Sequence, residues 1–254
     1  MQHLQQPEKS VEVEQKEEAK GEAGDREGIG IILFTLRNQT GKMMKKDPYE
    51  AYYRGTNVDV GQHLPSPSME RLGQLFKRNN VRRILDFYCG AGRNAIFLAQ
   101  KGFDVYGFDR SEMALRELRN KQKAATRKVH LRLLGLTGRL PYKSNFFDAV
   151  IVIRALYQAR VAEIKRDIKE IYRVTKPGGY VYIESDQQYV WRRRNLYGQR
   201  KTDEKGTYQH GHGKARQGDY YHYFTKDELW GFFKDFKFIR FYFKDRRFYV
   251  LLRR

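Results

Sequence analysis

The chain has 254 residues, a formal net charge of +20 and one cysteine, Cys89. This length is enough for one α/β domain with a substantial core, whereas a single cysteine excludes an intramolecular disulfide and a metal cage made of cysteines alone. The nearest candidate for a membrane segment, Ile29–Leu36, is well short of the roughly 18 apolar residues that a spanning helix needs and lacks the cleavage site of a signal peptide. We therefore expect a cytoplasmic protein that does not bind membranes.

The charge is distributed unevenly along the chain. Residues 1–30 contain four lysine or arginine residues and eight aspartate or glutamate residues, so the remainder carries +24. Because the first 28 residues contain almost no large apolar side chains, we predict a disordered, low-complexity extension over residues 1–42, followed by one domain over residues 43–254. A domain of this charge attracts polyanions, which leaves RNA open as a partner beside a small molecule.

From Ser68 onward, patterns typical of helices and strands alternate. In the first part they predict a helix at Ser68–Arg78 with Ser68 as its N-cap, a strand at Arg82–Tyr88, a helix at Arg93–Lys101, a strand at Asp104–Phe108, a helix that Ser111 caps and that runs into Lys121–Lys128, and a strand at Val129–Leu134. In the second part they predict a central strand at Phe147–Ile153, a helix at Val161–Val174, a strand at Tyr180–Glu184, a last helix opened by a capping box at Thr225, and closing strands at Phe236–Phe243 and Arg247–Leu252. Such alternation predicts a mostly parallel sheet with right-handed crossovers.

The strongest local signal is the sequence LDFYCGAGRN at Leu85–Asn94, which follows a predicted strand and opens a helix. Gly90 and Gly92 allow a tight turn and a close approach of the backbone to a ligand, and the helix N-terminus offers free amide groups. Asp86 lies toward the carboxyl end of the strand, where its carboxylate suits a cofactor with a cationic amine and would repel a pyrophosphate. The loop therefore predicts a nucleotide-like ligand that carries an amine.

Asp109 ends the next predicted strand, about 20 residues after Gly90, where an acidic side chain is placed to bind both hydroxyls of a ribose. A dinucleotide-dependent dehydrogenase fits less well, because the first glycine of its motif would fall at Tyr88. An α/β protein with a tight turn and no ligand remains the structural alternative.

With these residues in place, the sequence resembles the class I S-adenosylmethionine-dependent methyltransferases, in particular domains of type 11 and type 25. The matching stretches are ILDFYCGAGRN, GFDVYGFDRSE, LPYKSNFFDAVIV and IYRVTKPGGYVYIE, which follow the family's order between Val81 and Ser185. The stretch GRNAIFLAQKGFDV is most similar to the tellurite-resistance and thiopurine branch. The resemblance implies a Rossmann-like three-layer sandwich with a mostly parallel, seven-stranded sheet and an antiparallel last strand.

The resemblance also implies a cofactor, S-adenosylmethionine, and the residues that bind it. Asp86, Gly90 and Gly92 would hold the methionine end. Asp109 would bind the ribose, Arg110, Leu136 and Thr137 would contact the adenine, and Arg154 would line the methionine side near the acceptor. No metal is expected. The chain departs from the family at Tyr88, where a glycine is usual, at Leu136, where an aspartate is common, and at Tyr157, where many members carry a histidine.

The acceptor side is less defined by the sequence. Methyl transfer from a sulfonium needs alignment more than a dedicated base, and the candidates for a base are His222, Tyr157 and Tyr53. The long segment 186–224 is expected to form an acceptor-side insert, and it contains WRRRN at Trp191–Asn195. The leading hypothesis is a small-molecule acceptor. The alternatives are a tRNA or other RNA methyltransferase and a catalytically silent cofactor-binding regulator, and the oligomeric state is left open.

Overall fold

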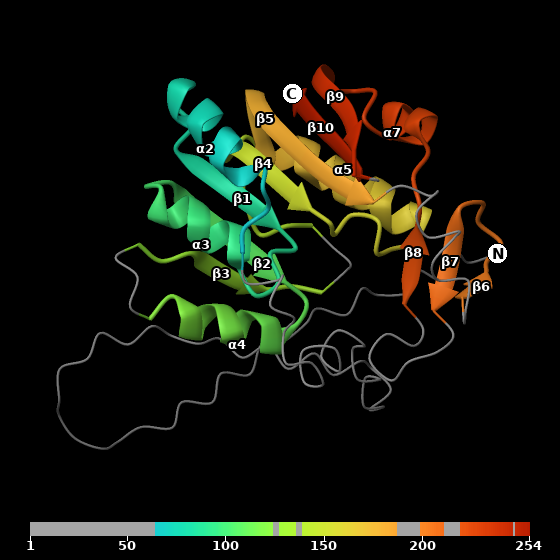
Figure 1. Ribbon diagram of the computed structural model, residues 1–254, viewed down its shortest axis with the longest axis horizontal. Coiled ribbons are helices and arrows are strands. Elements are labelled where there is room, and N and C mark those ends of the chain that lie inside the picture. The colour runs from blue at the N-terminus through green and yellow to red at the C-terminus, as the bar shows by residue number, and fades with distance from the viewer. Residues whose placement is uncertain (1–63, 124–126, 136–138, 187–198, 211–218, 246) are drawn as a thin grey trace, which may run out of the picture. The chain divides into compact units, whose positions relative to one another are not determined.

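The computed structural model describes residues 64–123, 127–135, 139–186, 199–210, 219–245 and 247–254 (Figure 1). All of them belong to one of the two units of the chain, Met44–Arg254. The predicted disorder of residues 1–42 lies outside the described residues, as do Tyr53, Leu136, Thr137 and the segment Trp191–Asn195. The structure and roles given for these residues stay predictions.

The main sheet has seven strands in the order β3-β2-β1-β4-β5-β10-β9. Their bounds are Arg83–Phe87 for β1, Asp104–Asp109 for β2, His130–Leu133 for β3, Phe147–Ile153 for β4, Thr175–Asp186 for β5, Lys237–Lys244 for β9 and Arg247–Arg253 for β10. Strands β1 to β5 pair in parallel, whereas β10 runs antiparallel to both β5 and β9. The expected mostly parallel sheet with an antiparallel last strand is therefore confirmed.

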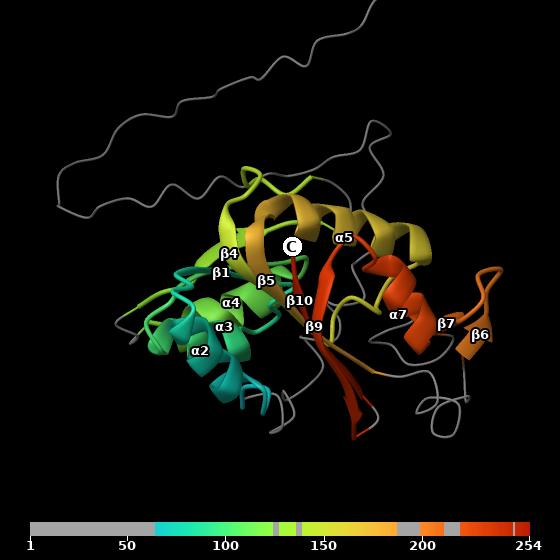
Figure 2. The ribbon, with the colours of Figure 1, turned by 90° about the horizontal axis from the view of Figure 1, so that it is seen from above.

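Helices cover both faces of this sheet (Figures 1 and 2). Helices α2 (Met69–Arg78), α3 (Arg93–Gln100) and α4 (Glu112–Lys121) lie on one face, and α5 (Val161–Val174) and α7 (Lys226–Phe232) lie on the other. Two separate apolar clusters reflect the two faces, because alternate residues of each strand point to opposite sides. Within β4, for example, Val150 and Val152 join the α5 cluster, whereas Ala149 and Ile151 join the α2–α3 cluster. This is the expected three-layer sandwich.

Two of the three predicted helix caps form as expected. The Ser111 hydroxyl accepts from the Ala114 amide at 3.1 Å, and Thr225 and Glu228 form a reciprocal capping box. Ser68 precedes α2, but its side chain makes no capping hydrogen bond. Its hydroxyl instead lies 3.4 Å from the carboxylate of Glu184, so this serine joins the helix to the end of β5.

Strand β5 begins earlier than the sequence predicts. It starts at Thr175 and includes the Pro177-Gly178-Gly179 turn as an irregularity in its pairing with β4. A Cβ on Gly179 would lie 2.8 Å from the Lys176 carbonyl oxygen and 2.9 Å from that of Asp148, so only glycine fits there. The Gly178 amide donates to the Arg254 carbonyl, and the Arg254 amide donates to the Gly179 carbonyl. These two hydrogen bonds attach the end of β10 to the turn.

The segment between β5 and α7 contains structure that the sequence did not predict. Strands β6 (Gln199–Lys201), β7 (Thr207–His210) and β8 (Tyr220–His222) form a separate antiparallel sheet. These strands have only three or four residues, too few for a recognisable alternation of apolar and polar side chains. The sheet is joined to the start of α5 by Arg160, which pairs with Asp203 at 2.6 Å and with Glu204 at 3.2 Å.

Candidate functional site

Three buried carboxylates lie at the carboxyl ends of the parallel strands. Asp86, Asp109 and Glu184 lie at or near the carboxyl ends of β1, β2 and β5, and their exposed fractions are 1%, 6% and 2%. Strand alternation places all three on the face that α2 and α3 cover. The carboxyl ends of parallel strands are the usual place for a ligand in an open α/β sheet. The structure therefore brings together the two acidic residues that the sequence singled out and adds a third.

Asp86 is a buried acid with an incomplete set of partners. Its Oδ2 atom forms no hydrogen bond with any other described residue. Burial, followed by the charge of Asp109, raises the pKa of Asp86 to about 7, against a lowering by Arg93 and a backbone hydrogen bond from Ala95. A buried acceptor without a donor is costly. This atom is suited to a ligand that brings its own hydrogen-bond donors, such as an ammonium group.

Asp109 holds the glycine loop in place. Its Oδ2 atom accepts from the Gly90 amide at 2.8 Å, and its Oδ1 atom accepts from the Ser111 amide at 3.0 Å. Burial raises the pKa of Asp109, while these backbone hydrogen bonds oppose the shift. A carboxylate has about four acceptor positions. Asp109 can therefore fix the loop and still accept from the hydroxyls of a bound sugar.

The two glycines of the loop adopt backbone conformations that favour glycine. The φ angles are 54° at Gly90 and 79° at Gly92. At Gly92, a Cβ atom would also lie 2.2 Å from Cγ of Leu118 on helix α4. The structure therefore gives Gly92 a packing role against α4, and its predicted role in ligand approach stays a prediction.

Tyr88 occupies the position where the resembled family usually has a glycine. Its φ angle is 58°, a left-handed backbone conformation that residues other than glycine rarely adopt. Contacts of the side chain support this conformation. The ring packs edge-on against Phe87 and Phe108, with centroid distances of 4.7 Å and 5.1 Å. The hydroxyl donates to Oδ2 of Asp167 on α5 at 3.1 Å. Burial raises the pKa of Tyr88 and raises that of Asp167 to about 7. The loop thus keeps its glycine-type conformation with a tyrosine anchored to the opposite helix layer.

A group of three arginines lies near Asp86 and Glu184. Burial lowers the pKa of Arg93, as does the charge of Arg154, while the charges of Glu184 and Asp86 oppose this. The charge of Arg247 also lowers the pKa of Arg93. The Arg247 guanidinium lies 3.9 Å from the carboxylate of Glu184. Two carboxylates and three arginines leave a net positive charge, which suits the carboxylate of an amino acid ligand.

Glu184, Arg93 and Arg247 were missed as site residues by the sequence analysis. The signal for Glu184 was present, because it ends a predicted parallel strand. The Ser66 hydroxyl donates to Glu184 at 2.6 Å, and the Ser66 amide donates to Asn94 on α3 at 2.8 Å. The segment before α2 is therefore attached directly to the site.

The small sheet of the insert contacts the same edge of the main sheet. Arg110, expected on the adenine side, lies 3.8 Å from the carboxylate of Asp219, and both side chains are mostly buried. The amide of His222 donates to the carbonyl of Tyr157 at 2.7 Å. These contacts attach the insert to the ends of β2 and β4.

The structure does not place the imidazole of His222 as an accessible base. The side chain is fully buried, and its Nδ1 atom lies 2.8 Å from the Thr207 hydroxyl. Burial lowers the pKa of His222, in opposition to the charge of Glu228. Tyr157 is 4% exposed and packs against the ring of Tyr221. Both residues therefore support the fold of the insert.

No group of three histidine, cysteine, aspartate or glutamate side chains is arranged as a metal site among the described residues. No helix in the described ranges combines the length and the apolar character that crossing a membrane requires.

Known proteins are similar to part of this chain. Residues 84–179 match the sequence model of a family described as a methyltransferase domain. An uncharacterized methyltransferase from Synechocystis is 35% identical over 98 residues, which are 39% of this chain and 44% of the relative. A demethylmenaquinone methyltransferase from Geobacillus kaustophilus is 36% identical over 131 residues, 48% of this chain and 55% of the relative. The chain therefore spans about half the length of these relatives.

Solved structures share the fold. A structure from Methanosarcina mazei, described as a SAM-dependent methyltransferase, has a TM-score of 0.61 and 24% sequence identity. The match covers 70% of this chain and 96% of that one. The finer resemblance to the tellurite-resistance and thiopurine branch stays a prediction.

Proposed function

With a methyltransferase domain at residues 84–179 as the premise, we propose that this protein is an enzyme that transfers a methyl group from S-adenosylmethionine to a small-molecule acceptor. The observation that carries the proposal is Asp86, whose buried Oδ2 atom has no hydrogen-bond partner among the described residues. The ammonium group of a methionine moiety supplies the donors that this atom lacks.

The proposed cofactor site extends across the ends of β1 and β2. Asp86 and the loop with Gly90 and Gly92 hold the methionine end, and Asp109 accepts from the ribose hydroxyls. The resemblance adds Arg110, Leu136 and Thr137 on the adenine side and Arg154 on the methionine side. Since the guanidinium of Arg110 pairs with Asp219, we expect its aliphatic stem to flank the adenine.

The bound cofactor supplies a methyl group on a positively charged sulfur, which the acceptor attacks in line. The protein's own contribution is alignment of the two reactants and exclusion of water. Asp86 fixes the ammonium end, while Arg93 and Arg154 favour the carboxylate. No residue is assigned as a general base, since one is required only where the acceptor keeps its proton until attack.

The contacts of the insert support a small acceptor. The His222 amide and the Arg110–Asp219 pair attach the insert to the ends of β4 and β2, which favours an enclosed acceptor side. A relative named demethylmenaquinone methyltransferase suggests hydroxylated quinols as the first acceptors to test. We further propose a cytoplasmic location, in keeping with the single cysteine.

The proposal is tested by incubating the full chain with methyl-labelled S-adenosylmethionine and a panel of reduced demethylquinones and other hydroxyaromatic compounds. We expect labelled product with at least one of them and none with Asp86→Asn. Labelling of bulk tRNA, with none of the small molecules labelled, would replace the proposal with an RNA methyltransferase. Tight cofactor binding without transfer to either class would favour the silent regulator.

A further inference from the structure

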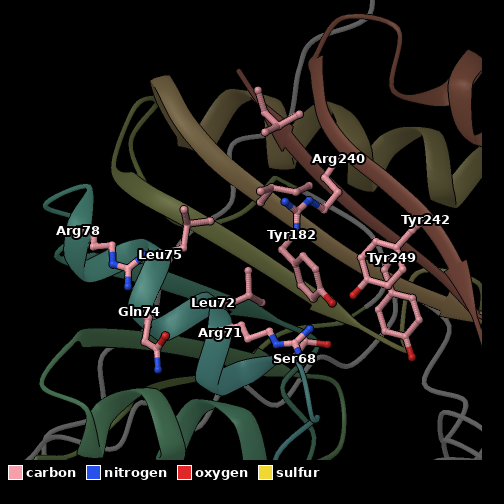
Figure 3. Close-up of a pocket in the computed structure, with 12 residues that line it drawn as sticks. Ser68, Arg71, Leu72, Gln74, Leu75, Arg78, Tyr182, Arg240, Tyr242 and Tyr249 are labelled. Carbon is pink, nitrogen blue, oxygen red and sulfur yellow. The ribbon is translucent and has the colours of Figure 1, made fainter.

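A groove separates α2 from the outer strands β5, β10 and β9 (Figure 3). It has a volume of about 420 Å³ and lies on the α2 face of the sheet. One wall is formed by side chains of α2, including Arg71, Leu75 and Arg78, and the other by strand residues such as Tyr182 and Tyr249. It contains none of the carboxylates of the proposed cofactor site.

The groove is positively charged. Three exposed arginines line it, Arg71, Arg78 and Arg240, and no aspartate or glutamate is among its lining residues. None of the three guanidinium groups forms an ion pair with another described residue. Arg253, on the same face of β10, lies over the ring of Tyr180 at 4.7 Å from its centroid. This surface therefore attracts an anionic partner.

The groove also presents aromatic rings. Tyr242 and Tyr249 are stacked with their centroids 4.7 Å apart and their planes at 4°, and Tyr242 is 39% exposed. Tyr182 also lines the groove and is 4% exposed. Burial raises the pKa of Tyr182, while a hydrogen bond with Ser68 opposes the shift.

One end of the groove meets the proposed site. Ser68 lines the groove, and its hydroxyl lies 3.4 Å from Glu184. Ser66, two residues earlier, is hydrogen-bonded to both Glu184 and Asn94. From Ser68 the groove follows α2 to Arg78 at the end of the helix. An extended polymer in the groove would therefore lie beside the site without entering it.

We propose that this groove binds single-stranded RNA. Aromatic rings that stack on bases and guanidinium groups that bind phosphates are the combination found in proteins that bind single-stranded nucleic acids. A second copy of this chain fits poorly, because the three arginines would approach their own symmetry mates. A flat anionic membrane does not follow a concave groove. The inference goes beyond the proposed function, because bound RNA need not be the methyl acceptor.

The first experiment measures fluorescence anisotropy of a labelled oligouridylate of about a dozen nucleotides with the full chain over a range of salt concentrations. The groove variant is Arg71→Ala/Arg240→Ala, and the matched control is Arg116→Ala/Arg119→Ala, which removes two exposed arginines of α4. We expect the groove variant to bind about tenfold more weakly or worse. Its salt slope should be lower by about 1.4, the contribution of two phosphate contacts. The control should change the affinity less than about threefold.

A second variant, Tyr242→Ala, tests stacking. We expect it to weaken binding about fivefold or more while it leaves the salt slope unchanged, since no charge is removed. Equal losses in the groove and control double variants would overturn the proposal, because binding would then follow overall charge. No binding by the wild type at low salt would overturn it as well.

Competitors distinguish the remaining occupants. Tighter, groove-dependent binding of an acidic peptide or of phosphatidylserine vesicles than of the oligonucleotide would overturn the RNA assignment, as would dimerisation that the groove variant abolishes. Calorimetric titration of each variant with S-adenosylhomocysteine separates this inference from the proposed function. We expect wild-type cofactor affinity in Arg71→Ala/Arg240→Ala, which also shows that the variant is folded.

Discussion

Replacement of Asp86 by asparagine should stabilise the protein while it weakens cofactor binding. The carboxyl is 1% exposed and its pKa rises from 3.8 to about 7 on folding. A shift of this size costs about 4 kcal/mol of folding free energy once the group is ionised. Asparagine removes this cost but leaves a buried amide donor without a partner, which costs about 1–3 kcal/mol. The expected net gain above pH 7 is therefore about 1–3 kcal/mol.

The stability difference between the wild type and Asp86→Asn depends on pH. As the pH rises, the unfolded chain loses the Asp86 proton near 3.8 and the folded chain loses it near 7. The wild type therefore loses stability relative to Asp86→Asn across this range, and the difference is constant above it. Urea unfolding near pH 4 and pH 8 measures both limits, with Asp235→Asn, an exposed aspartate, as the control. A variant that is less stable than the wild type by the same amount at both pH values would refute the reasoning.

Two further substitutions test the loop. Gly92→Ala should destabilise the protein by about 1–3 kcal/mol or more in urea unfolding, because of the positive φ and the 2.2 Å approach to Leu118. The cost should fall in a Leu118→Ala background, and an unchanged cost there would exclude the steric explanation. Tyr88→Phe removes the donor to Asp167, so the pKa of Asp167 should rise above about 7. Stability at high pH should fall by about 1–2 kcal/mol; carbon-13 NMR titration of the carboxyl that finds its pKa unchanged would contradict the proposed hydrogen bond.

The strands and helices of the main sheet were predictable because their residues follow simple periods. Ala149–Ile153 within β4 is a continuous apolar run, as is typical of a central parallel strand, and Ile164, Ile168 and Ile171 repeat at helical spacing. Asp86 and Asp109 were predictable because each lies at the carboxyl end of a strand, on the same face of the sheet. For these elements, local sequence and burial agree.

The rest of the site depends on contacts between residues far apart in the chain. Nothing local to Tyr88 indicates that its hydroxyl reaches Asp167, 79 positions later. The Arg110–Asp219 pair likewise needs the small sheet of the insert, whose strands are too short to show a pattern. The packing role of Gly92 could not be predicted, because the neighbour that excludes a side chain, Leu118, belongs to the next helix.

The most direct test of the account is calorimetric titration with S-adenosylhomocysteine of the wild type, of Asp109→Asn and of Asp104→Asn. The last variant changes a carboxylate at the opposite end of the same strand. We predict that the wild type and Asp104→Asn bind one equivalent with similar affinity, and that Asp109→Asn binds about tenfold more weakly or worse. No binding by the wild type would contradict the account, and wild-type affinity in Asp109→Asn would contradict the role given to Asp109.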